Sequence, residues 1–121
     1  HHNNNPELVE RMSKINGYHT QLCANYLSKL AATPDGEGSL LDNMTILYGS
    51  GLSNSTNHSG VNLPILLLGG GAGWIKGGQH LRFNNEPTMA DLLLTLMDQF
   101  QLPLDSIGGS SGRLSLDGMT A

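Results

Sequence analysis

Histidine is the residue type on which chemistry in this sequence would depend. His58 lies in a polar loop, His19 lies on an expected helix, and His1 and His2 precede that helix. Neutral imidazole is a common metal ligand in proteins, so rings from separate elements could converge on one divalent cation. Zinc is the first candidate, with magnesium or calcium as the alternatives. No H-x-x-x-H or H-E-x-x-H pair is present, so spacing alone leaves a solvated His58 and a core His19 open.

Ser50 is the candidate nucleophile, because it follows an apolar run within Gly49-Ser50-Gly51. The nucleophile elbow of α/β-hydrolases needs glycine two residues before the serine and two after it. Tyr48 and Leu52 occupy those positions here. We therefore expect these small residues to let the backbone approach a ligand or a neighbouring loop, and we assign no catalytic residue.

The glycine run Gly69–Gly73 follows a second apolar segment, where a phosphate-binding loop would lie. It lacks the Lys-Ser/Thr of a P-loop and opens no clear helix, so we interpret it as a connection packed tightly against a neighbour. The single cysteine, Cys23, excludes an internal disulfide and a thiolate zinc cluster. It lies among apolar residues, which favours a buried and inert thiol.

The elements that would position these side chains can be followed along the chain. Asn5-Pro6 predicts a helix start, and Thr33-Pro34 predicts its end. An apolar stripe lies between them at alternating spacings of three and four residues: Leu8, Met12, Ile15, His19, Leu22, Tyr26 and Leu30. The segment 35–38 reads as a turn.

Two apolar runs without alternation, Met44–Gly49 and Leu63–Leu68, predict strands buried on both faces, as in a parallel sheet. Ligands bind where the carboxyl ends of such strands release their loops, so the loop from Gly49 to Gly60 is the expected site. Thr88 and Asp91 have capping-box spacing and predict a helix that ends at Leu102-Pro103. The expected buried face of this helix consists of Leu92, Leu93, Leu96, Met97 and Phe100. A short strand is expected after it, at Arg113–Leu116.

Length and charge exclude several classes of protein. A chain of 121 residues is long enough for one domain, 1–121, with its own core. The formal net charge of -4, with six Lys and Arg, argues against binding to nucleic acid or an anionic membrane. No apolar run reaches the roughly 18 residues that a membrane span needs. The sequence starts at His1 without methionine or a signal peptide, which suggests a piece of a longer chain, or a tag remnant at His1-His2.

The amino-acid sequence resembles the C-terminal part of the members of a bacterial family of unknown function, the HXXSHH family. The resemblance covers nearly the whole chain and rests on these segments, in order: HHNNNPELVERMSKINGYH, LAATPDGEGSLLDNMTILYGSGLSNSTNHSGVNLPILLLGGG, IKGGQHLRF and TMADLLLTLMDQF. In that family His1 and His2 would be the last two residues of the name-giving motif. Its first histidine and its serine would lie upstream.

That family looks like a member of the alkaline-phosphatase and sulfatase superfamily, which implies a three-layer α/β/α sandwich and a metal-centred hydrolase site. By this resemblance His2 would match a ligand histidine, and His58 would match the late histidine of the superfamily site. Ser50 and Gly51 fall where related enzymes carry an Asp-His pair, so a two-metal site of the usual kind does not follow.

Two functions are consistent with these observations. In the first, the chain is part of a periplasmic or secreted metal-dependent hydrolase of phosphate or sulfate esters, inactive as this piece, with His2, His58, His1 and His19 as candidate ligands. In the second, it is a non-catalytic scaffold or binding domain that keeps the fold. The expected fold class is α/β, with a small, mainly parallel sheet and two main helices. Expected partners are a second copy or the N-terminal part of the full-length protein.

Overall fold

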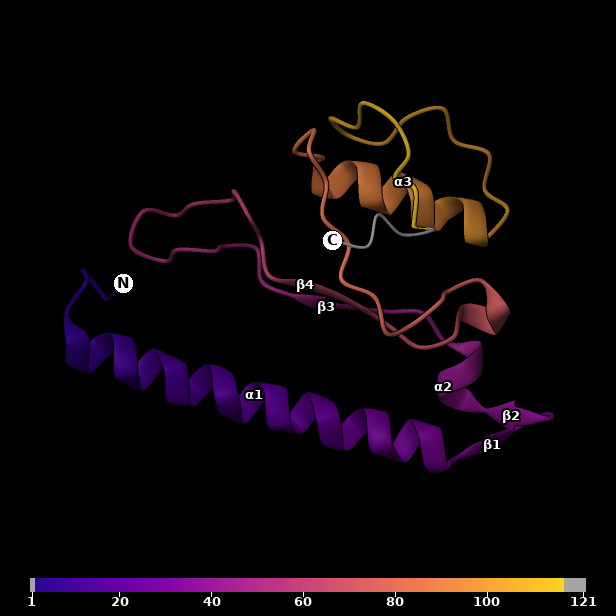
Figure 1. Cartoon of the computed structure of the whole chain (residues 1–121), viewed down its shortest axis with the longest axis horizontal. Coiled ribbons are helices and arrows are strands. Elements are labelled where there is room, and N and C mark those ends of the chain that lie inside the picture. Colours follow the sequence, from indigo (N-terminus) through magenta and orange to yellow (C-terminus); the bar gives the residue numbers. More distant parts are fainter. Residues whose placement is uncertain (1, 117–121) are drawn as a thin grey trace. The chain divides into compact units, whose positions relative to one another are not determined.

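The structure, a computed structural model, describes residues 2–116 of the chain (Figure 1). The chain forms two compact units, which we describe separately. Unit 1 extends to Gly70 and contains α1, β1, β2, α2, β3 and β4. Unit 2 starts at Gly71 and contains the short 3-10 helix η1 and the helix α3.

Helix α1 spans Pro6–Ala32 and has the ends that the sequence predicts. The Asn5 side chain accepts hydrogen bonds from the backbone N–H groups of Glu7 and Leu8, at 3.0 and 3.2 Å. These bonds satisfy two of the amides that a helix N-terminus leaves without partners. Thr33 is the C-cap, in the extended conformation that a following proline imposes.

The apolar stripe of α1 is present but is not covered. Five of its large side chains are 37% to 50% exposed: Leu8, Met12, Ile15, Leu22 and Tyr26. Among the residues of α1, all of which the structure describes, only Leu30 is buried. Cys23, expected to be buried, is half-buried, and His19 is exposed. The pattern predicted the helix correctly, but not the degree of its burial.

A small hairpin and a one-turn helix follow α1. Strands β1 (Pro34–Asp35) and β2 (Gly38–Ser39) pair antiparallel around the predicted turn. Helix α2 (Leu40–Asn43) starts at Ser39, whose side chain accepts from the backbone of Asp42 while the Asp42 carboxylate accepts from the backbone of Ser39. This capping box was not predicted, because Leu40–Asn43 reads as a simple lead into the next strand.

Strands β3 (Ile46–Gly49) and β4 (Ile65–Leu68) form an antiparallel pair, so the expectation of a mainly parallel sheet is wrong. Ile46 lies opposite Leu68, and Gly49 lies opposite Ile65. An antiparallel return needs only a loop, whereas parallel neighbours need a crossover of a dozen residues or more, usually helical. The polar segment 50–64 forms such a loop and contains no helix. The fold remains α/β in the broad sense of helices combined with small antiparallel sheets.

The strands are also less buried than their composition predicts. Leu47 is 38% exposed and Leu66 is 52% exposed. Within residues 2–116, β3 and β4 pair only with each other, so each has one edge without a backbone partner. Apolar runs therefore indicated strands correctly, but their two-sided burial was not confirmed.

The first two glycines after β4 pack closely against the backbone, as the interpretation of the run Gly69–Gly73 requires, whereas a Cβ at Gly73 would meet no neighbouring atom. Gly69 has a φ of +93°, and a Cβ there would collide with the carbonyl oxygen of Met44. A Cβ at Gly70 would collide with the carbonyl oxygen of Asp42, and the Gly70 amide donates to the Leu41 carbonyl at 2.9 Å. Only glycine allows the end of β4 to lie this close to the segment before β3.

Unit 2 is organised around α3, which spans Met89–Gln99. Thr88 is its N-cap, and the predicted capping box with Asp91 is present. Of the predicted buried face only Leu96 is buried; Leu92, Leu93 and Met97 are half-buried, and Phe100 is 60% exposed. Leu94, which was not predicted, is the most buried leucine of α3.

The helix ends earlier than Leu102-Pro103, with Phe100 as its C-cap. Before α3, η1 (Gly71–Gly73) is tied to the helix by Gln99, whose Nε2 donates to the Gly71 carbonyl at 3.0 Å. After α3, the described residues 107–116 form turns and irregular backbone, so the expected strand at Arg113–Leu116 is wrong. Their amides bond to side chains of α3 instead of to a neighbouring strand. No helix within residues 2–116 has the length and apolar character that crossing a membrane requires.

Candidate functional site

The segment before α1 is fastened to the loop between β3 and β4, where sequence analysis placed the site. Thr56, in that loop, accepts a hydrogen bond from the Asn3 backbone N–H at 3.0 Å. The same Oγ1 lies 3.3 Å from Nδ1 of His2. The fold thus brings His2 onto the loop that carries His58, across more than fifty residues of sequence.

The loop is shaped by its own asparagine. The Asn54 side-chain oxygen accepts from the backbone N–H groups of Thr56 and Asn57, at 2.9 and 3.3 Å. Asparagine favours such turns because its short side chain can imitate a backbone carbonyl. Asn54 and Ser59 then close the loop as an isolated antiparallel bridge. Thr56 is therefore presented from a structured turn, which fixes the position of its hydroxyl.

The contacts of the His2 ring determine what the ring could bind. Nδ1 accepts a hydrogen bond from the Asn4 backbone N–H at 3.1 Å, so a neutral ring in this arrangement carries its proton on Nε2. Coordination of a metal through Nε2 would require the proton on Nδ1 instead. Thr56 Oγ1 is then the nearby oxygen that can accept that proton. In that tautomer the Asn4 amide would have to turn away from Nδ1, and the Thr56 hydroxyl would then be the group that orients the ring.

Three residues of this region have left-handed backbone conformations that are rare outside glycine. The φ angles of Asn3, Asn4 and His58 are 47°, 56° and 50°. Asparagine adopts this region more readily than most residues, whereas histidine does so at some cost. The backbone at His58 is therefore set by the turn, and it fixes where its imidazole leaves the loop.

The other candidate ligands are not gathered here. His19 lies on α1, and the helical rise of ~1.5 Å per residue puts it roughly 20 Å along the axis from Pro6. His1 is outside the described residues. Within residues 2–116 there is no group of three or more His, Cys, Asp or Glu side chains placed to hold a metal ion. The structure brings His2 to the loop of His58 and leaves His19 elsewhere.

Ser50 has the geometry of a turn residue. Its Oγ donates to the Leu52 carbonyl at 2.9 Å and accepts from the Leu52 amide at 3.2 Å. Both partners are local backbone groups and neither is a general base, so the hydroxyl is not activated as a nucleophile would be. The Ser50 hydroxyl therefore stabilises its own turn.

Unit 2 contains a polar centre that sequence reasoning did not find. Asp91 is only 2% exposed, although carboxylates are rarely buried without partners. One of its oxygens accepts from Thr88, and the other accepts from the backbone amides of Ser111 and Gly112 at 2.6 and 3.0 Å. The hydrogen bond from the Thr88 backbone, followed by that from Ser111, holds the pKa of Asp91 far below its usual range.

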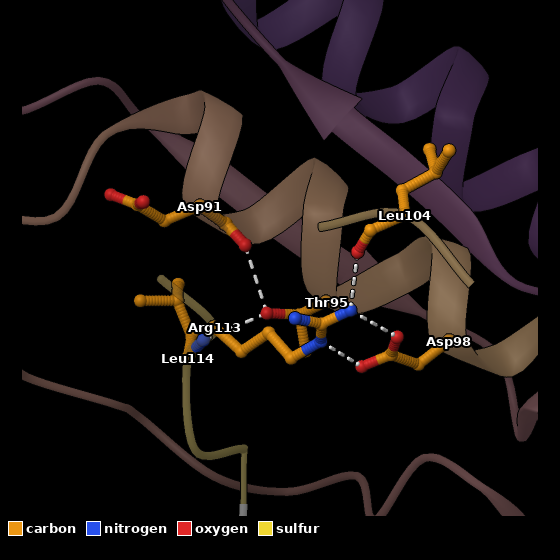
Figure 2. A network of polar contacts seen from close by, with 6 residues as sticks. All are labelled: Asp91, Thr95, Asp98, Leu104, Arg113 and Leu114. Carbon is orange, nitrogen blue, oxygen red and sulfur yellow. Dashed lines mark hydrogen bonds and ion pairs between the residues drawn. The ribbon is translucent and has the colours of Figure 1, made fainter. Parts of the chain in front are cut away.

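Two further residues, Thr95 and Arg113, extend this centre along α3 (Figure 2). The Thr95 hydroxyl donates to the Asp91 carbonyl at 2.8 Å and accepts from the Leu114 amide at 2.7 Å. Arg113 bonds both carboxylate oxygens of Asp98, at 2.6 and 3.0 Å, and the carbonyl of Leu104 at 2.7 Å. The capping-box spacing could have pointed to Asp91, but no sequence signal links it to the segment 111–114.

The hydrogen bonds of Asp91 and its neighbours join the segment 111–114 to α3. Every described buried side-chain nitrogen and oxygen has a hydrogen-bond partner, so no unpaired group is aimed at a ligand. The candidate site therefore remains the contact between His2 and the loop from Asn54 to Ser59. Comparison with family models, curated proteins and solved structures finds no match to this chain.

Proposed function

We propose that this chain is part of a metal-dependent hydrolase of phosphate or sulfate esters, and that His2 and the loop Asn54–Ser59 form one wall of its site. The observation that carries the proposal is the contact between His2 Nδ1 and Thr56 Oγ1. It brings a histidine from before α1 to the loop at the end of β3, where His58 also lies.

In this proposal the residues of the chain bind a metal ion and orient the ring that holds it. A divalent cation at such a site polarises the ester oxygen and lowers the pKa of a bound water. His2 would bind it through Nε2, with Thr56 accepting the proton on Nδ1. His58 would supply a second imidazole from the same loop. A metal partner also fits an anionic substrate, because the chain itself carries a net charge of -4.

The resemblance to the HXXSHH family supports the same assignment. It matches His2 and His58 to ligand histidines of the alkaline-phosphatase and sulfatase superfamily. The upstream histidine and serine of the family motif would be further polar groups near His2. The proposal therefore places the rest of the ligand set, and the nucleophile, outside residues 2–116.

A non-catalytic scaffold or binding domain is the second candidate, and a specific observation favours it. The described residues include no group of three side chains able to hold a metal. Ser50 and Gly51 also offer no ligand where related hydrolases would carry an Asp-His pair.

Zinc titration separates the two candidates. Because the proposal places the rest of the ligand set outside residues 2–116, we expect wild-type protein to bind zinc weakly, at one site per chain, by calorimetry. His2→Ala and His58→Ala should each remove this binding. His80→Ala is the matched control, because His80 is exposed and is not one of the candidate ligands. Absence of binding, or equal loss in all three variants, would contradict the metal site and leave the scaffold.

The role of Thr56 gives a sharper test of the same site. Thr56→Val keeps the shape of the side chain and removes the oxygen that faces Nδ1. Zinc affinity should fall about 10- to 100-fold, as is typical for the loss of a group that orients a metal-binding histidine. Thr56→Ser should restore it. Unchanged affinity in Thr56→Val would exclude this hydroxyl from the site, whatever the fate of His58.

A further inference from the structure

The uncovered stripe of α1 is the largest feature that the proposed site does not use. Leu8, Met12, Ile15, Leu22 and Tyr26 are all large, lie on one side of the helix and are between 37% and 50% exposed. Val9 and Tyr18, at the margins of the stripe, are 43% and 64% exposed. Contiguous apolar surface of this kind marks an interaction site. The stripe ends at Leu30, which is buried.

The order of residues in the stripe is self-complementary. We infer that α1 pairs with α1 of a second copy of this chain, antiparallel and about a two-fold axis level with Gly17. The spacing of four, three, four, three and four residues reads the same from either end. The pairing therefore forms three kinds of layer, each occurring twice: Leu8 opposite Tyr26 of the second copy, Met12 opposite Leu22, and Ile15 opposite His19.

The faces that pair carry no charged side chain. Glu10 and Lys14 lie on the far side of α1 from the stripe, because the helix turns about 100° per residue, so they do not approach the second copy. Antiparallel helices also oppose their dipoles favourably. A parallel pairing would instead stack the two His19 rings in one layer.

The available area matches what a stable dimer needs, at its lower limit. A large apolar side chain of this kind removes roughly 60–120 Å² from water when it is covered. The five apolar layer positions on each helix, with Val9 and Tyr18 beside them, therefore bury on the order of 800–1,700 Å² in total. Stable interfaces start near ~1,200 Å². The expected dimer is thus symmetric and concentration-dependent.

Analytical ultracentrifugation of the whole chain tests the pairing. Wild type should change from monomer to dimer across the micromolar range. Ile15→Lys places two charges at the centre of the contact and should weaken dimerisation at least ~100-fold. Ser13→Lys adds the same charge on the opposite side of α1 and should leave the dimer intact. Circular dichroism confirms that each variant keeps its helix content. A wild type that is monomeric throughout, or equal effects of the two lysines, overturns the inference.

Disulfide trapping tests the orientation. In a Cys23→Ser background, the double variant Leu8→Cys with Tyr26→Cys should form covalent dimers on mild oxidation, because antiparallel pairing brings the two positions together. Leu8→Cys alone should not. The two positions are too far apart on one helix to join within a chain. Cross-linking of the single variant, or none in the double variant, overturns the antiparallel arrangement.

Discussion

The two capping boxes of this chain have the same local design and different surroundings. In unit 1, Ser39 and Asp42 exchange hydrogen bonds at the start of α2. In unit 2, Thr88 and Asp91 do the same at the start of α3. Asp42 is exposed, whereas Asp91 is 2% exposed and also accepts the amides of Ser111 and Gly112. The capping box marks a helix start at both places. In unit 2 its aspartate also anchors a second segment of the chain.

The pKa values of the two capping carboxylates follow the number of hydrogen bonds that each carboxylate accepts. The Ser39 side chain and backbone lower the pKa of Asp42. The pKa of Asp91 is lowered much further, first by the Thr88 backbone and then by that of Ser111. In both cases hydrogen bonds to the charged form outweigh desolvation. The comparison teaches that a capping carboxylate can be buried only when the chain that covers it also supplies donors.

The largest expected effect is the loss of the anchor. Asp91→Ala leaves the amides of Ser111 and Gly112 without their acceptor and removes the cap partner of Thr88. The melting temperature should fall by on the order of 10 °C, because several buried donors lose their bonds at once. Asp42→Ala should lower it by a few degrees at most. Differential scanning calorimetry measures both, and an equal loss would show that burial does not distinguish the two boxes.

The pH dependence of stability should come next in size. A folded-state pKa below the usual value of 3.8 means that the carboxylate stabilises the fold fully above pH ~5, and that this contribution disappears as the pH falls through the acid range. Denaturation by urea at pH 6, 4 and 3 should show this loss in wild type. Asp91→Asn, which cannot ionise, should start less stable and lose less. If the free energy of unfolding fell equally with pH in wild type and in Asp91→Asn, Asp91 would not be the source of the pH dependence.

Sequence reasoning predicted local features well and long-range ones poorly, for a physical reason. Asn5 and Thr88 predict helix starts because a cap acts within three residues. The prediction of a parallel sheet was wrong because it rested on the apolar composition of the two strands, whereas the polar segment 50–64 lacks the helical pattern that a parallel crossover usually has. The segment that covers Asp91 was missed because Ser111 bonds the carboxylate through its backbone amide, which any residue could supply.

The candidate site shows the same division. The loop after β3 could be chosen from residue types alone, because polar residues follow an apolar strand there. The contact of His2 with Thr56 could not, since it joins residues fifty-four positions apart. The resemblance supplied His2 as a candidate, and the structure places it on the loop of His58.

A smaller effect is expected at Thr95, which connects Asp91 to the end of the described chain. Thr95→Val keeps the volume of a buried side chain and leaves the Leu114 amide without its acceptor. The free energy of unfolding should fall by about 1–3 kcal/mol. Thr95→Ser retains the hydroxyl and should cost less. Hydrogen exchange adds a local reading: the Leu114 amide should lose protection in Thr95→Val and keep it in Thr95→Ser.

The smallest expected effect compares the cap hydroxyls directly. Thr88→Ala and Ser39→Ala each remove one oxygen that accepts a helix amide, which ordinarily costs about 1 kcal/mol. Thr88 also donates to the Asp91 carboxylate at 2.9 Å in the buried box, whereas Ser39 donates to Asp42 at 2.7 Å in the exposed one. Since water can replace the lost donor only at the exposed box, Thr88→Ala should be the costlier substitution by a few tenths of a kcal/mol. Urea denaturation of both variants at pH 7 measures the difference. A reversed order would mean that the donors from Ser111 and Gly112 alone keep Asp91 in place, and that the capping box is only its neighbour.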